Sequence, residues 1–323
     1  MAAKMRVSDA DVAKLLTPTD FVSSCDDAFR LYGSGEMLNP ARNESMTREG
    51  GLEVFRLELP GEWVGRFRAR KVIVERSNPL TGRLGERTAV IELEDLTGQT
   101  LCLFDAEYIT NMRTGAAGVL AVKYLGRLPI RKLSILGTGR IARALALCAD
   151  AVLRPETICV TSRKPESRHA FAEEIGPRLG CELLLSPTIE ACVSHSDAIL
   201  AAVPTATPVL TRAMVASGTH ISVLGGDPRT EQLDPELFLS RPLLPDHANQ
   251  VLQSGEFLAA EKAGRQAKWV TGTAGEKKDI GHAALGKLEN LRGKGAIVYF
   301  SGMAIQDLHA ASVAWERFRD RIF

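Results

Sequence analysis

The 323-residue sequence lacks the signatures of several protein classes. Its six cysteines include no Cys-x-x-Cys pair and its six histidines show no ligand spacing, so we expect neither a disulfide framework nor a metal site. The first residues show no secretory signal pattern, and no apolar run approaches the ~20 residues of a membrane helix. Because 40 basic residues balance 39 acidic ones without a long block of one sign, neither nucleic acid nor a membrane is expected as a partner. These absences favour a globular protein of a reducing compartment, the cytoplasm.

Hydrophobic patterning divides the chain into two parts. The first part has helical patterns at its beginning and end, and alternating apolar residues between them. Thr97-Gly98 separates two such alternating runs and predicts a hairpin turn. The predicted elements are helices at 8–16, 18–32 and 106–124 and strands at 52–59, 65–75, 88–96 and 99–104.

From Lys132 onward, short apolar strands alternate with helical segments. This alternation is typical of an α/β protein with a doubly wound parallel sheet. The charged, glycine-containing stretch 275–294 is predicted to be a surface excursion. We therefore predict a Rossmann-type domain over 126–302 and a second, α+β domain formed by 1–125 and 303–323. The predicted elements of the second part are strands at 133–137, 157–161, 182–185, 198–203, 220–224 and 296–300 and helices at 141–153, 166–179, 188–194 and 304–319.

A glycine-rich turn follows the first strand of this second part. Gly137 allows a tight turn, Gly139 allows the backbone to approach a pyrophosphate, and Ala142 permits close packing of the helix on the strand. The motif lies between a predicted strand and a predicted helix, which is the context that a dinucleotide site requires. The residues of the turn that we expect to contact the cofactor are Gly137, Thr138, Gly139, Arg140 and Ile141.

The end of the next strand predicts which nicotinamide cofactor is bound. NAD-binding proteins usually carry an acidic residue there, whereas this chain has Ser162-Arg163-Lys164. A hydroxyl followed by two cations suits a 2′-phosphate, so NADP(H) is preferred and NAD(H) remains possible. Alternatively, the two cations are solvated loop residues, and both cofactors are used. Further cofactor contacts are expected at the carboxyl ends of two later strands, from Ala202, Val203, Pro204, Gly225 and Asp227.

Several segments of the chain resemble the ornithine cyclodeaminase/μ-crystallin family. They occur in the family's order across nearly the whole sequence, at 39–42, 71–74, 95–98, 109–118, 137–139, 220–228, 231–236, 254–256 and 302–307. The resemblance implies an NAD(P)-binding Rossmann domain and a domain for substrate binding and homodimer formation. His309, on the last predicted helix, is expected to face the partner subunit.

The resemblance also implies a set of site residues. Arg42, Lys71 and Arg113 match the basic positions that hold a substrate carboxylate, and Asp227 matches an acidic position at the reacting amine. Each has a plainer interpretation: Arg42 and Lys71 as solvated charges, Arg113 as a helix cap or the partner of a carboxylate, and Asp227 as an Asx turn before a proline. Gly302 is expected beside the substrate. Arg113 and Thr114 are expected beside the cofactor.

These residues favour reduction of a small α-imino acid, or reductive amination of an α-keto acid, to an amino acid. Lys71 and Asp227 would then be the catalytic residues. One alternative is an ornithine cyclodeaminase, in which Glu58 would engage the substrate amine if its strand register points it to the site. The other alternative is a μ-crystallin-like protein that binds NADPH without important turnover.

Overall fold

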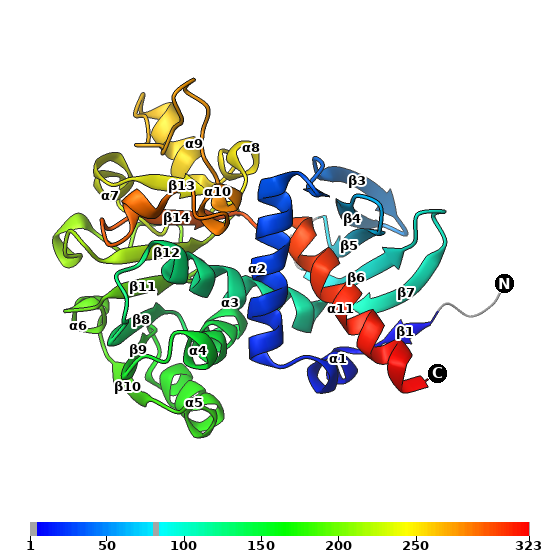
Figure 1. Ribbon diagram of the computed structural model, residues 1–323, viewed down its shortest axis with the longest axis horizontal. Helices are drawn as coiled ribbons and strands as arrows, with labels where there is room; N and C mark the ends of the chain where they lie inside the picture. Colours follow the sequence, from blue (N-terminus) through cyan, green and yellow to red (C-terminus); the bar gives the residue numbers. More distant parts are fainter. Residues whose placement is uncertain (1–4, 80–83, 323) are drawn as a thin grey trace.

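The computed structural model describes residues 5–79 and 84–322, and its strands form two seven-stranded sheets on either side of a central group of helices (Figure 1). Positions 1–4, 80–83 and 323, which include the outer ends of the second predicted domain, lie outside the described residues. The mixed α/β architecture with a parallel sheet confirms the predicted fold class. In the described ranges, none of the helices has both the length and the apolar content that crossing a bilayer requires.

The first sheet is mainly antiparallel, as predicted. Its order is β1-β7-β6-β5-β4-β2, with β3 paired to the other part of β4. The predicted hairpin is present, and Gly98 takes φ 82° in its turn while the Asp95 carboxylate accepts hydrogen bonds from the turn's N–H groups. The strands are β1 (Arg6–Val7), β2 (Met37–Leu38), β3 (Asn43–Glu49), β4 (Leu52–Trp63), β5 (Phe67–Ser77), β6 (Leu84–Glu94) and β7 (Thr100–Asp105).

The second sheet is parallel throughout, in the order β10-β9-β8-β11-β12-β14-β13. The order reverses direction at β8, so the carboxyl ends of β8 and β11 form the switch point where ligands of such sheets bind. The strands are β8 (Lys132–Leu136), β9 (Thr157–Thr161), β10 (Glu182–Ser186), β11 (Ala198–Ala201), β12 (His220–Leu224), β13 (Leu243–Pro245) and β14 (Ile297–Phe300). The helices that accompany them are α4 (Arg140–Val152), α5 (Pro165–Ile175), α6 (Ile189–Val193), α7 (Pro235–Ser240), α8 (Ala248–Val251) and α9 (Gly255–Lys262).

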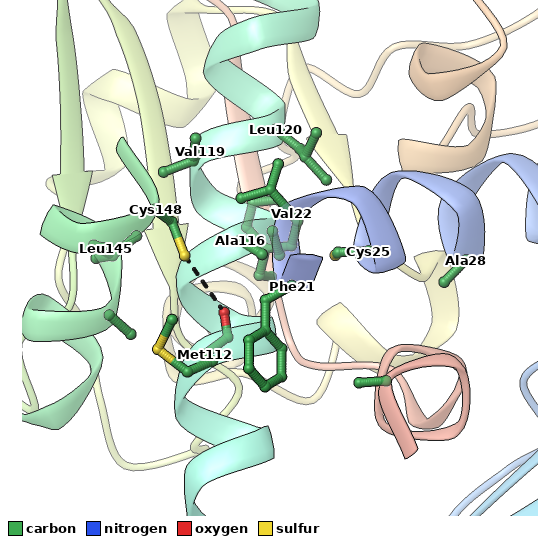
Figure 2. Close-up of a cluster of buried hydrophobic side chains, with 14 of the residues drawn as sticks. Phe21, Val22, Cys25, Ala28, Met112, Ala116, Val119, Leu120, Leu145 and Cys148 are labelled. Atoms are coloured by element: carbon green, nitrogen blue, oxygen red, sulfur yellow. Dashed lines mark hydrogen bonds between the residues drawn. The ribbon is translucent and has the colours of Figure 1, made fainter. Parts of the chain in front are cut away.

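Small residues bring the central helices close together. A Cβ at Gly115 would lie 2.6 Å from the Ala144 carbonyl carbon, so α3 approaches the α4 backbone closely. Figure 2 shows the apolar contacts between α2, α3 and α4, among them Phe21, Met112 and Leu145. This packing joins the two sheets through one continuous core. The helices on the side of the first sheet are α1 (Asp9–Leu15), α2 (Pro18–Ser34), α3 (Ala106–Leu125) and α11 (Ala304–Ile322).

Two sequence-based expectations are wrong. The stretch 275–294 contains α10 (Ile280–Ala284), whose apolar side is buried against α2, where the Gly281 and Gly33 backbones meet. The single apolar helical turn of α10 gives only a weak pattern in the sequence, because charged residues flank it on both sides. His309 does not face outward: its ring stacks on Trp63 at 5.0 Å and its Nδ1 lies 2.8 Å from the Ser24 hydroxyl.

Strand β3 was not predicted because all seven of its residues are exposed and most are polar.

Candidate active site

Two buried cations share one carboxylate where β5, α3 and α11 meet. The ammonium of Lys71 lies 2.6 Å from Oδ2 of Asp307 and 3.5 Å from the Thr110 hydroxyl. The guanidinium of Arg113 donates to Oδ1 of the same Asp307 at 3.2 Å and to the Gln306 side chain at 3.1 Å. The Lys71 and Asp307 side chains are only 3% and 2% exposed. The interpretation of Lys71 as a solvated charge is therefore wrong, whereas Arg113 does have a carboxylate partner.

The electrostatic balance of this cluster favours binding of an anion. Burial lowers the pKa of Lys71 to about 8, although the nearby Asp307 charge opposes that shift. Burial acts to raise the pKa of Asp307, but Arg113 and Lys71 outweigh it, and the pKa lies below its usual value. Two cations and one carboxylate leave an excess positive charge in a poorly solvated place. A substrate carboxylate would neutralise it.

Gly302 lies directly against the guanidinium of Arg113. It takes φ 84°, and a Cβ there would be 3.1 Å from Arg113 Nη1, so both backbone conformation and space require glycine. The turn is held by buried Asp246, which accepts hydrogen bonds from the N–H groups of Ser301 and Gly302 at 2.9 and 2.7 Å. Asn39 accepts from the Ala304 N–H at 2.7 Å and so fixes the start of α11. The chain segments that surround the cations are thus locked to one another.

Arg42 lies in the irregular segment between β2 and β3 and lines a cavity of about 690 Å³. Its Nε is buried and has no hydrogen-bond partner in the described part of the chain. Burial lowers the pKa of Arg42, while the charges of Glu44 and Asp246 oppose that shift and the charge of Arg113 adds to it. An unpartnered buried donor beside a cavity is suited to hold an anion. The cavity is lined by Asn39, Ala41, Arg42, Glu44, Gly226, Pro228, His247, Asn249, Gln250 and Gln253.

Asp227 stands in the sequence between Gly226 and Pro228, which both line the same cavity. Its Oδ1 accepts from the Arg229 N–H at 2.8 Å, which is the Asx turn considered above, and its Oδ2 is 2.7 Å from Arg229 Nη2. This hydrogen bonding lowers the pKa of Asp227, so the group is a carboxylate at neutral pH. The structure pairs Asp227 with Arg229 and does not bring it into contact with Lys71 or Arg113 within the described ranges.

The glycine turn between β8 and α4 has the geometry that a dinucleotide requires. A Cβ at Gly137, where φ is 110°, would lie 2.7 Å from the Ala202 carbonyl oxygen, whereas one at Gly139 would meet nothing within 4 Å. Gly139 is the N-cap of α4 and offers no side chain to its free N–H groups. These donors face a cavity of about 340 Å³ and fit a pyrophosphate. Five predicted cofactor residues line it, namely Gly139, Arg140, Ile141, Ala202 and Pro204.

Four further predicted cofactor residues are Thr138 in the turn itself, Thr114 on α3, and Val203 and Gly225 next to the parallel sheet. The Thr138 carbonyl accepts from Arg143, while the Thr114 hydroxyl donates to the Thr110 carbonyl of its own helix at 2.6 Å. Val203 and Gly225 follow β11 and β12, which are neighbours in the sheet. Arg140 pairs with Glu107 across the cavity.

Ser162, Arg163 and Lys164 directly follow β9. The Ser162 hydroxyl donates to the Lys164 carbonyl at 3.3 Å. Both cations are exposed, and neither takes part in any ion pair among the residues that the structure describes. Their charges are therefore available to a phosphate group at this end of the sheet.

The sequence-based reasoning missed three residues that organise the site. Gln306 and Asp307 lie in the matched motif at 302–307 but were given no role. The signal that could have identified Asp307 is a carboxylate on an otherwise apolar side of a helix, where a buried charge needs a partner. Asp246 has no comparable local signal, because its partners are backbone N–H groups of another segment.

The fold and the site define a class: a Rossmann-type α/β protein with a glycine turn and a buried cationic centre. More particularly, the chain belongs to the ornithine cyclodeaminase/mu-crystallin family, whose model matches residues 2–321. The chain is 26% identical to an alanine dehydrogenase of Archaeoglobus fulgidus, over 96% of this chain and 94% of the relative. It is 28% identical to a Delta(1)-pyrroline-2-carboxylate reductase of Bacillus cereus, over 75% of each chain. A solved Delta(1)-pyrroline-2-carboxylate reductase of Thermococcus litoralis, in complex with NADH and L-proline, is 26% identical, with a TM-score of 0.84 over 98% of both chains.

Proposed function

We propose that this protein is an NAD(P)H-dependent oxidoreductase acting on C–N bonds, which reduces a small α-imino acid to an amino acid. The observation that carries this proposal is the buried pair of Lys71 and Arg113, which shares the single carboxylate of Asp307 and retains an excess positive charge. An imino acid brings the carboxylate that neutralises it. The relatives support this reaction class, since two are named for reduction of pyrroline-2-carboxylate, a cyclic imine that carries a carboxylate.

We assign Arg42, Lys71 and Arg113 to the substrate carboxylate, with Gly302 providing the close approach. Asp227, ionised at neutral pH, stabilises the cationic imine that accepts hydride readily. Lys71, with a pKa of about 8, can deliver a proton near neutral pH. A bound reduced nicotinamide supplies the hydride.

We propose that residues 126–302 bind the dinucleotide and that 1–125 and 303–323 bind substrate. The exposed cations Arg163 and Lys164 support NADP(H) over NAD(H), because neither is occupied by a carboxylate in the described chain. The proposed cofactor contacts are Arg113, Thr114, Gly137, Thr138, Gly139, Arg140, Ile141, Ser162, Arg163, Lys164, Ala202, Val203, Pro204, Gly225 and Asp227.

We also propose that the protein is a cytoplasmic homodimer. α11 packs on one face of β4, β5 and β6, the face that carries Lys71. The opposite face carries Val72 and Val90, which are only half-buried and suit an interface between two copies. Sedimentation equilibrium tests the dimer, and a concentration-independent monomer mass contradicts it. Six free cysteines, five of them buried, support a reducing location.

The cyclodeaminase alternative receives no support from the strand register. Glu58 pairs with Val72, whereas Lys71 pairs with the adjacent Leu59. Glu58 therefore points to the sheet face opposite Lys71, where its carboxylate is paired with Arg56 at 2.8 Å.

The test is oxidation of NADPH and NADH, followed by loss of the reduced-nicotinamide absorbance. Cyclic imino acids are supplied directly, and pyruvate, glyoxylate and oxaloacetate are each combined with ammonia or methylamine. Ornithine is assayed in parallel for release of ammonia. Rapid oxidation with one imine or keto acid is the expected result. Deamination of ornithine without oxidation of either cofactor would establish the cyclodeaminase instead. Inactivity in all assays, with NADPH still bound, would favour a μ-crystallin-like binding role.

A further inference from the structure

A buried amide bridges the ends of two neighbouring strands at the dinucleotide edge of the parallel sheet. The ladder between β11 and β12 ends at Ala201 and Val223. Beyond this ladder, the Gln232 side chain joins the two strand ends. Its Oε1 accepts from the Val203 N–H at 2.9 Å, and its Nε2 donates to the Leu224 carbonyl at 3.0 Å. Gln232 is only 1% exposed, whereas Val203 and Leu224 are half-buried.

The backbone of Gln232 is itself fixed from two directions. Its N–H donates to Oε1 of buried Glu256 at 2.7 Å, and the Tyr299 hydroxyl donates to Oε2 of that carboxylate at 2.5 Å. On the other side, the Gln232 carbonyl accepts from the Leu210 N–H at 3.1 Å. A Cβ at Gly225 would lie 2.2 Å from the Tyr299 hydroxyl, so the β12 end fits closely against the same network. The amide therefore has little freedom to follow a moving loop.

Gln232 joins loop 202–204 to the last residue of β12, which leads into loop 225–228, and these two loops line different cavities. Loop 202–204 faces the cavity at the glycine turn, and the Ala202 carbonyl is the atom that limits the space at Gly137. Loop 225–228 faces the cavity that contains Arg42. The side chain of Gln232 thus links the wall of one cavity to the wall of the other.

We infer that Gln232 is a positioning residue, which holds the dinucleotide-facing loop 202–204 in register with the substrate-facing loop 225–228. This inference rests on the function proposed above. Hydride transfer requires the reacting atoms to be held within about 3–3.5 Å, and a shift of about 1 Å can reduce the rate about 100-fold. Gln232 touches neither reactant and acts through the two loops.

The decisive variant is Gln232→Glu, which keeps the shape and the acceptor for Val203 but places an oxygen against the Leu224 carbonyl. Gln232→Met removes both bonds. The matched control is Ser134→Ala on β8, in the same sheet. It removes the buried hydrogen bonds between the Ser134 hydroxyl and the Cys192 carbonyl and Ser196 hydroxyl. We expect both Gln232 variants to weaken NADPH binding at least about tenfold and to lower kcat further, while the control changes only the melting temperature.

The experiment is a fluorescence titration of each protein with NADPH and NADH, together with kcat, KM and the melting temperature. In Gln232→Glu, lowering the pH should restore NADPH binding relative to the parent protein, because a protonated carboxyl group again has one donor and one acceptor. The nearby acidic groups Glu231 and Glu256 favour this protonated form. Parent-like binding and turnover in Gln232→Glu, or a loss of melting temperature alone as in Ser134→Ala, would overturn the inference.

The same titration separates this inference from the proposed function. Weakened dinucleotide binding in both Gln232 variants of a protein that reduces no imine supports the positioning role and removes the proposed reaction. A parent protein that binds neither dinucleotide overturns both.

Discussion

The glycine turn and the buried cation site are suited to bind anions by opposite means. The turn occupies six consecutive residues, 137–142, and offers backbone N–H groups to an open space at Gly139. The cation site instead joins residues up to 236 positions apart, Lys71 and Asp307, and encloses its charges in the core. A local, open site tolerates change at its edge, whereas a buried charge cluster fails as a unit when one member is removed.

The largest effect on stability and activity is expected when the buried cation site loses the carboxylate of Asp307. Asp307→Asn leaves Lys71 and Arg113 buried together without neutralisation, so we expect a loss of about 3 kcal/mol in the free energy of unfolding and nearly complete loss of imine reduction. Urea denaturation and the reductase assay measure these changes. Asp227→Asn is the control, because its half-exposed side chain should cost less than about 0.5 kcal/mol while still reducing turnover. Equal stability losses in the two variants would contradict the contrast between a buried and an exposed carboxylate.

This contrast also explains how much the sequence could reveal. The turn and its flanking elements follow from local rules, and the predicted strand 157–161 coincides with β9. The fold class and the hairpin were predictable for the same reason. The apolar side of α11 indicates that Asp307 is buried and needs a partner, but the identity of that partner was not predictable, because it depends on which face of β5 meets α11.

The second prediction compares two glycines within the turn. Gly137→Ala forces a side chain into a positive-φ position against the Ala202 carbonyl, so we expect a loss of about 1–3 kcal/mol in stability. Gly139→Ala has ordinary φ and open space, so the fold should keep its stability while dinucleotide binding weakens about tenfold. Thermal melting and NADPH titration separate the two effects. A stability loss in Gly139→Ala as large as that in Gly137→Ala would mean that the space at Gly139 is not reserved for a ligand.

A third, smaller effect concerns the protonation of Lys71. Because burial lowers its pKa to about 8, the ammonium form is lost as the pH rises through that value. If the charged form binds or protonates substrate, kcat/KM should fall about tenfold per unit above pH 8. In Lys71→Arg the guanidinium stays charged, so residual activity should lack this decline. Persistence of the same alkaline limb in Lys71→Arg would assign it to the substrate or to another group.

The smallest effect is expected at the exposed end of the dinucleotide site. Arg163→Ala removes a solvated cation with no ion-pair partner in the described chain, so the melting temperature should not change. The KM for NADPH should rise about threefold to fivefold, in keeping with an exposed charge contact, while the KM for NADH stays constant. Arg265→Ala, which removes another exposed arginine, serves as the control. Equal changes for both cofactors would mean that Arg163 does not read the 2′-phosphate. In that case selectivity between NADP(H) and NAD(H) does not depend on Arg163.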